Sequence, residues 1–188
     1  MLTSPTAEQT QLFRSLFRVR EDVFAIRWES GNKQGYMPAY SYDPYMYKLH
    51  KMKGGSFKNY KDKSYLPLTD QELSKHFVGQ QHVGGYPLLI DNSSWFIAAD
   101  FDKQNWKDES LTFLEACRNK NIPAYLERSR SGNGAHVWVF FETAYPAIRS
   151  RKVIASILEE IGIFSLFDKN SSFDRLFPNQ DFHSGKGL

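Results

Sequence analysis

The stretch WFIAADFD, residues 95–102, limits the possible folds more than any other part of the sequence. Its apolar residues are typical of a buried strand, yet the strand ends in two carboxylates, Asp100 and Asp102. Since successive side chains on a strand point to opposite faces, both acids project from one face and Phe101 projects from the other. Because burying an unpaired charge is costly and like charges repel, a cation is expected beside this strand end.

Two kinds of cation could meet this requirement. A pair of carboxylates with only oxygen donors suits Mg²⁺ or Mn²⁺ better than zinc. The alternative is a pair of exposed strand-end acids that Lys103 or an arginine neutralises. The one cysteine, Cys117, excludes an intramolecular disulfide and a multi-cysteine zinc site, and it is expected in the core. No zinc is therefore expected.

The apolar runs after residue 85 predict a sheet with helices between its strands. The turn residues DNSS between the first two runs predict a hairpin. The order β-α-β-β-α-β is that of a split β-α-β unit like the RNA recognition motif, so the fold class is α+β. The predicted strands are residues 86–90, 95–102, 123–129, 135–141 and one near Phe173, and the predicted helices are residues 108–120, with Leu111, Leu114 and Cys117 inward, and a helix after Pro146 with Val153, Ile154, Ile157, Leu158 and Ile161 inward.

A glycine-containing turn precedes the strand that carries His136. The small residues Ser131, Gly132, Asn133 and Gly134 would let backbone N–H groups approach a phosphate. In a split β-α-β unit the strands that carry Asp100 and His136 can be neighbours, which would place anion-binding groups beside a metal site. This combination indicates a metal-bound triphosphate as the ligand.

The stretch SSFDRLFPNQD, residues 171–181, offers a third acid for such a site. Asp174 is the favoured residue, and Asp181 is its competitor. Arg175 beside a metal ligand could neutralise phosphate charge, although an ordinary surface ion pair explains it nearly as well.

Residues 1–85 are expected to form an N-terminal α/β annex, and residues 86–188 the sheet described above. Capping-box patterns at Thr6 and Thr69 predict helices in the annex. Residues 45–65 carry six lysines against one acid, with aromatic residues between them, although the net charge is only +3. Cations for phosphates and rings for bases are typical of single-strand binding, while the alternative is a solvated basic loop. The nucleic-acid-binding residues predicted for this loop are Lys48, Lys51, Lys53, Lys58, Tyr60, Lys61 and Lys63.

No apolar run approaches the length of a membrane span, and no charged-then-apolar leader opens the sequence. We expect a cytoplasmic protein with no membrane partner.

The three motifs, in this order, resemble those of the archaeo-eukaryotic primase superfamily. The stretches LFRVREDVFAIRWES, GYMPA, LPLTD, GGYPLLIDNSSWFIAADFD, SGNGAHVW and SSFDRLFPNQD are more closely similar to the primase domain of TOTE conflict systems and to CRISPR-associated primase-polymerases. The resemblance covers nearly the whole chain. It implies a catalytic core with an RNA-recognition-motif-like sheet and template-directed synthesis of DNA or RNA on a single-stranded template, from NTP or dNTP, with or without a primer.

The resemblance also implies roles for individual residues. Asp100, Asp102 and Asp174 match the metal ligands, which would hold two Mg²⁺ or Mn²⁺ ions, and His136 matches the histidine that contacts the phosphates of the incoming nucleotide. The nucleotide-binding residues it implies are Arg130, Ser131, Gly132, Asn133, Gly134, His136 and Arg175.

The sequence departs from these relatives in two places. Many relatives carry a cysteine cluster, suggestive of zinc, where residues 45–65 stand here. The chain also stops at GKGL where relatives continue, so an excised catalytic fragment that works with further domains or subunits is expected. Two rival functions stay open: a metal-dependent nuclease that uses the same acids to activate water, and a non-catalytic single-strand-binding module.

Overall fold

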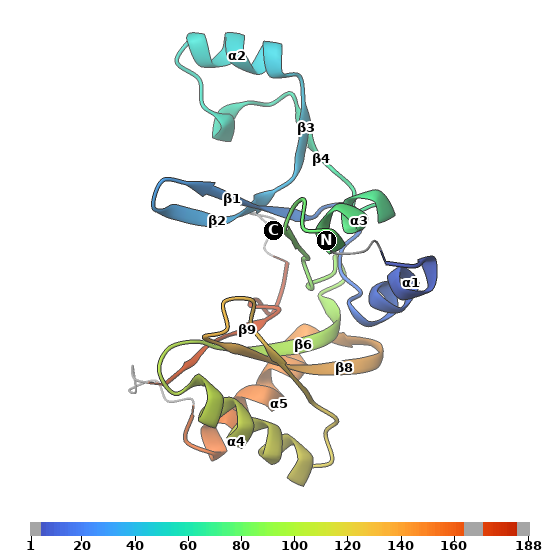
Figure 1. The fold of residues 1–188 in the computed structure, drawn as a ribbon, viewed down its shortest axis with the longest axis vertical. Coiled ribbons are helices and arrows are strands. Elements are labelled where there is room, and N and C mark those ends of the chain that lie inside the picture. Colours follow the sequence, from blue (N-terminus) through green and yellow to red (C-terminus); the bar gives the residue numbers. More distant parts are fainter. Residues whose placement is uncertain (1–4, 164–170, 184–188) are drawn as a thin grey trace. The chain divides into compact units, whose positions relative to one another are not determined.

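A computed structural model describes residues 5–163 and 171–183 of the chain. The chain forms two compact units (Figure 1): the first comprises Met1–Leu12 and Arg20–Tyr86, and the second comprises Phe13–Val19 and Pro87–Leu188. The terminal GKGL lies outside the described residues. Within the described ranges, every helix is too short or too polar to span a bilayer.

The second unit is built on a four-stranded antiparallel sheet in the order β7-β8-β6-β9. Two helices lie on one face of this sheet (Figure 1). The chain order β-α-β-β-α-β confirms the α+β fold class and the split β-α-β arrangement. The elements are β6 Ser93–Phe101, α4 Trp106–Asn119, β7 Tyr125–Arg128, β8 Ala135–Pro146, α5 Ala147–Glu160 and β9 Phe173–Phe177.

The core of this unit lies between the sheet and the two helices. Phe101 of β6 and Phe113 of α4 are buried, with ring centroids 5.9 Å apart. Burying side chains of this size stabilises the fold by about 1.5–3 kcal/mol each. Cys117 is buried in the same cluster, where burial raises the pKa of its thiol to about 11 and leaves it unreactive at neutral pH.

The opposite face of the sheet is partly covered by one aromatic side chain. Phe17 lies 6.3 Å from Phe96, 5.1 Å from Trp138 and 5.6 Å from Phe140, measured between ring centroids. β6 is therefore apolar on both faces along its middle, and its one charged residue, Asp100, lies at its end.

The predicted hairpin between residues 86–90 and β6 is wrong. Residues 86–90 form no strand; the Leu89 N–H donates to the carbonyl of Ser93 in a turn in which Asn92 has a φ of 65°. The residues DNSS close a tight turn before β6, in which the Asp91 carboxylate accepts from the Ser93 N–H, and β6 pairs instead with β8 and, at Ala98–Phe101, with β9.

Two of the predicted inward residues of the helices point outward. Leu111 is 42% exposed and Val153 is 49% exposed. In α4 the buried positions are Ser110, Phe113 and Cys117, which are one turn apart. Because the polar residue Ser110 occupies a core position, the spacing of apolar residues did not reveal the buried face of α4.

The first unit contains a three-stranded sheet, a two-stranded sheet and short helices. The N-terminal capping box is confirmed, because the Thr6 hydroxyl accepts from the Gln9 N–H and the Gln9 carboxamide accepts from the Thr6 N–H. α3 is capped by Thr69, but the Glu72 carboxylate pairs with Lys75 instead of closing a box. The elements are α1 Ala7–Leu16, which continues into the second unit, β1 Ala25–Ser30, β2 Lys33–Pro38, β3 Tyr40–Tyr42, α2 Pro44–Met52, η1 Phe57–Asn59, β4 Lys63–Tyr65, α3 Asp70–Phe77 and β5 Val83–Gly84.

The prediction of a loop over residues 45–65 is wrong for most of that range. It contains most of α2, the turn of 3-10 helix η1 and strand β4. α2 starts at the Asp43 side chain, which accepts from two backbone N–H groups, and it stops before Gly54, whose φ is 82°. An aromatic cluster with centroid distances between 5.1 and 5.7 Å holds these pieces together; its members are Tyr40, Tyr42, Tyr47, Phe57, Tyr60 and Tyr65. The glycines prevent one long helix here, and packing among the aromatic rings holds the shorter elements together instead.

Candidate active site

A row of charged side chains crosses the four-stranded sheet. Asp100 of β6 lies directly opposite His136 of β8 on one side and Arg175 of β9 on the other, and Glu127 of β7 lies opposite His136. Since directly opposite residues of antiparallel strands share a face, the four side chains form one row, Glu127–His136–Asp100–Arg175. Acidic and basic groups alternate along this row.

Three aspartates converge at the end of β6. Asp100, Asp102 and Asp174 each offer a carboxylate oxygen, and these oxygens all lie within 4.8 Å of one another. The competitor Asp181 instead pairs with Arg151 of α5, at 2.7 Å from its Nε. Of the two acids left open by the sequence, Asp174 is therefore the one that joins the pair on β6.

A β-bulge brings Asp174 into this group. β9 pairs Phe173 with Phe101 and Arg175 with Asp100, so that Asp174 is an extra residue in the ladder. At a bulge, two residues of one strand oppose a single residue of the other. Asp174 and Arg175 consequently turn to the same side although they are consecutive, and the Arg175 Nε donates to the Asp174 carboxylate at 2.6 Å.

The carboxylates at the end of β6 have too little positive charge around them to balance their own negative charge. Burial raises the pKa of Asp100, whose side chain is 15% exposed; His136 lowers that pKa, and Asp102 and Asp174 raise it further. The close Glu127 carboxylate raises the pKa of His136 against the effect of burial, and Asp100 raises it too. A divalent cation would relieve the repulsion among the three carboxylates, and oxygen donors of this type suit Mg²⁺ or Mn²⁺. The residues present therefore fit such a metal site.

The predicted phosphate turn lies against the same group. A Cβ on Gly134 would meet the Asp102 Oδ1 at 2.5 Å and the Phe101 carbonyl at 2.7 Å, so only glycine allows this approach. The turn is closed by its own hydrogen bonds: the Gly132 N–H donates to the Ser129 carbonyl and the Asn133 N–H donates to the Ser131 hydroxyl. Two of the backbone donors expected for a phosphate are thus engaged within the turn.

Comparison with models of protein families identifies the family to which this chain belongs. The family model for the archaeo-eukaryotic primase domain of the TOTE conflict system matches residues 8–188. The chain belongs to this family. None of the curated proteins compared with the chain matches it. Archaeo-eukaryotic primases generally use divalent metals, which agrees with the acidic triad of this primase-family domain.

Two further groups in the domain support the triad and were not foreseen from the sequence. Glu109 of α4 accepts from the Ser171 hydroxyl, the Ser172 N–H at 2.9 Å and the Ser172 hydroxyl at 2.7 Å, and the Ser172 carbonyl accepts from the Asp102 N–H. This network ties the start of β9 to the end of β6. The second group is Glu127, which contacts His136. No local pattern marks either acid, because each acts across more than eight residues of sequence.

The remaining predicted nucleotide-binding residue, Arg130, is exposed on the same turn as Ser131. The neighbouring Arg128 donates from its guanidinium to the Gly132 carbonyl at 2.9 Å and so stiffens the turn. Gly132 itself has a φ of 77°, a conformation that favours glycine.

The basic segment, residues 45–65, lies in the first unit, and the structure divides its predicted residues into two sets. Tyr60 is only 5% exposed, which argues against a base-stacking role for its ring. Lys63 is half-buried; its ammonium donates to the Phe57 carbonyl and lies 4.5 Å from the centroid of the Phe57 ring. The lysines that remain exposed are Lys48, Lys51, Lys53, Lys58 and Lys61.

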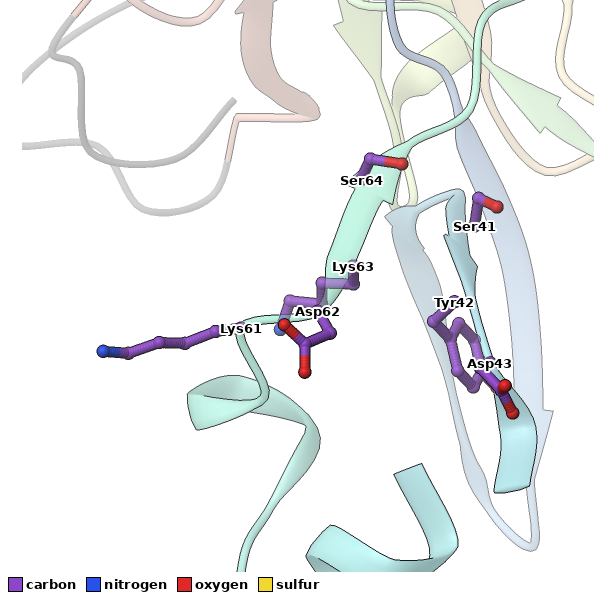
Figure 2. Close-up of a pocket in the computed structure, with 7 residues that line it drawn as sticks. All are labelled: Ser41, Tyr42, Asp43, Lys61, Asp62, Lys63 and Ser64. Atoms are coloured by element: carbon purple, nitrogen blue, oxygen red, sulfur yellow. The ribbon is translucent and has the colours of Figure 1, made fainter. Parts of the chain in front are cut away.

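A shallow pocket of about 450 Å³ lies beside this segment (Figure 2). The side chain of Lys61 extends away from Tyr42 and Asp43 in this view. Acidic and basic groups are mixed in its lining, which therefore carries no clear preference for an anion; the residues are Ser41, Tyr42, Asp43, Lys61, Asp62, Lys63 and Ser64.

Proposed function

We propose that this primase-family domain is a template-directed nucleotidyltransferase, a primase-polymerase that adds nucleotides to a 3′-hydroxyl. The observation that carries the proposal is the meeting of three carboxylates with His136 on one face of the sheet. When bound, two Mg²⁺ or Mn²⁺ ions would supply the Lewis acidity that activates the hydroxyl and stabilises the leaving pyrophosphate.

The protein's own residues divide the remaining work. Asp100, Asp102 and Asp174 would hold the ions. His136, whose Nε2 lies on the side of the triad, would donate to the phosphates of the incoming nucleotide, a task worth roughly 3 kcal/mol for a well-placed donor. Arg175 already pairs with Asp174, and its half-exposed guanidinium would neutralise phosphate charge next to it.

The turn of residues 130–134 would close the nucleotide site. Of its members, Ser131 and Gly134 make no backbone N–H hydrogen bond that the described structure shows, and these are the donors we assign to the phosphates. Arg130 would add positive charge at the rim.

The predicted N-terminal annex, residues 1–85, would hold the nucleic acid. Five exposed lysines of the basic segment would neutralise phosphates of a single-stranded template or primer. Such a protein would work in the cytoplasm, where nucleotides and nucleic acid are both present, together with further domains or subunits of a defence or replication system.

The direct test is an incorporation assay. Wild-type protein, single-stranded template, Mg²⁺ or Mn²⁺ and either NTP or dNTP are incubated with and without primer, and products are resolved on a gel. We expect extension that EDTA abolishes and that Asp100→Ala with Asp102→Ala lowers roughly 1,000-fold or more. Asp108→Asn, an exposed acid of α4, serves as the control and should leave the rate unchanged.

Other outcomes would identify the rival functions. Degradation of labelled DNA without nucleoside triphosphates would identify a nuclease. Unchanged DNA binding in EDTA without any incorporation would identify a binding module. Synthesis at the wild-type rate by the double alanine variant would refute the role of the triad.

A further inference from the structure

Glu127 lies on β7, an edge strand whose four residues are all exposed. Its carboxylate nevertheless contacts other side chains of the sheet. One oxygen, Oε2, accepts from the Trp138 indole Nε1 at 2.8 Å and lies 3.3 Å from His136 Nδ1. A single carboxylate oxygen thus serves two side chains of the neighbouring strand β8.

The indole that holds Glu127 is itself held by packing. The Trp138 ring contacts Phe17 at 5.1 Å between centroids and Phe96 at 5.3 Å, and it stacks on Phe140 at 6.1 Å with the planes 6° apart. With its indole fixed in this way, Trp138 presents its N–H in a constant direction. The Glu127 carboxylate is therefore preorganised beside the imidazole before any ligand arrives.

The imidazole needs such a partner. His136 Nδ1 is buried and, among the described residues, has no hydrogen bond of good geometry; the Glu127 Oε2 lies 3.3 Å from it. The other ring nitrogen, Nε2, lies 3.6 Å from Asp100 Oδ1, on the side of the metal triad. A carboxylate at one ring nitrogen fixes the orientation of the imidazole and hence the direction in which the other nitrogen faces.

We propose that Glu127 is a positioning residue for His136. It accepts from the Nδ1–H group and turns the Nε2–H group toward the phosphates of a nucleotide bound at the triad, with Trp138 as the rigid support. The inference rests on the proposed nucleotidyltransferase function. In the described part of the chain Glu127 contacts Trp138 and His136, and the effect proposed for it passes through the histidine.

A purely structural role would give a different pattern of effects. The Glu127 side chain is 54% exposed, and removing an exposed polar contact of this kind costs little stability. A variant that keeps its stability but binds the nucleotide more weakly would separate positioning from folding. The matched control is Glu142→Ala, an exposed glutamate farther along β8.

The first experiment is a kinetic double-mutant cycle with Glu127→Ala, His136→Ala and both together. We expect Glu127→Ala to raise the nucleotide KM about tenfold, and the double variant to differ from His136→Ala by less than about twofold, because coupled residues are not additive. Glu127→Gln should recover part of the loss, since its amide oxygen can still accept from Trp138. A wild-type KM for Glu127→Ala, or additive effects in the double variant, would overturn the inference.

The second experiment reads the imidazole directly. ¹⁵N NMR of histidine-labelled protein, with His136→Ala to assign the signal, should show an Nδ1 signal that shifts in Glu127→Ala, because the carboxylate 3.3 Å from Nδ1 is then missing. An unchanged His136 spectrum would overturn the inference even if the wild type incorporated no nucleotide. Absent incorporation by the wild type, with the expected NMR change, would instead count against the proposed function alone.

Discussion

Charged side chains are used differently in the sheet of the second unit and in the basic segment of the first. In the sheet, Asp100 and His136 lie on inner strands, are largely shielded from water and contact other charged groups. In the basic segment it is the aromatic rings that pack, while lysines such as Lys48 and Lys51 are exposed on a helix. Bond-forming chemistry needs groups held to a fraction of an ångström, whereas attraction of a polyanion needs only exposed charge.

The strongest test of this difference is to add a single methyl group at the sheet site, where precise positions should matter most. Gly134→Ala would place a Cβ 2.5 Å from the Asp102 Oδ1 and force that carboxylate away from the triad. We expect nucleotide incorporation to fall roughly 100-fold, as misplacement by about 1 Å can do. Steady-state incorporation at saturating Mg²⁺ measures it.

Gly31→Ala is the control for that substitution, because it lies at a positive φ in a turn of the first unit with nothing near its Cβ. Its backbone strain should lower stability a little and leave incorporation nearly unchanged. Equal loss of activity in both variants would show that general strain, and not the position of Asp102, is responsible.

The second prediction concerns the basic segment. Replacing Lys48 and Lys51 together by Ala should weaken binding to single-stranded DNA about tenfold and lower the steepness of its salt dependence by about one per lost phosphate contact. Fluorescence anisotropy over a series of salt concentrations measures both. The kcat for incorporation on saturating template should stay close to the wild-type value.

Lys63→Ala provides the matched comparison within the same segment. Its ammonium is engaged by the Phe57 carbonyl and ring, so the substitution should lower thermal stability and change the salt dependence little. A loss of DNA affinity equal to that of the Lys48 and Lys51 variant, without loss of stability, would contradict the division into exposed and packed lysines.

The smallest expected effect is on stability in the absence of metal. Burial raises the pKa of Asp100, so the folded state favours the protonated acid, and that contribution is lost as pH rises through the raised pKa. At neutral pH the ionised Asp100 therefore destabilises the metal-free fold. We expect Asp100→Asn to raise the melting temperature by a few degrees while abolishing activity.

Adding Mg²⁺ should reverse the order of the two melting temperatures, so that the wild type melts above Asp100→Asn. Metal that binds only the folded state stabilises it by about 2.7 kcal/mol at a concentration 100 times the Kd, so the wild type should gain and Asp100→Asn should not. Differential scanning fluorimetry with and without Mg²⁺ measures this. An Asp100→Asn variant that melts below the metal-free wild type would show that the acid is already neutralised by His136.

Much of the second unit could be predicted from local patterns. The alternation of side chains placed Asp100 and Asp102 on one face, and the order of apolar runs indicated the split β-α-β sheet that β6 to β9 form. The hairpin at residues 86–90 was wrong because an apolar run carries no information about which segments pair with each other as strands. The loop over residues 45–65 was wrong because the Asp43 cap starts a helix before the glycines and packing among aromatic rings orders the segments on both sides of them.

By itself the sequence determined which residue types are present and which face of each strand they occupy. Only the tertiary structure decided between Asp174 and Asp181, because a bulge shifts the register of β9 and Arg151 takes the other acid. It also revealed Glu109 and Glu127, whose contacts join β9 to α4 and β8 to β7. The physical reason is that alternation and periodicity are local, whereas register, bulges and counter-charges depend on which distant segments the core brings together.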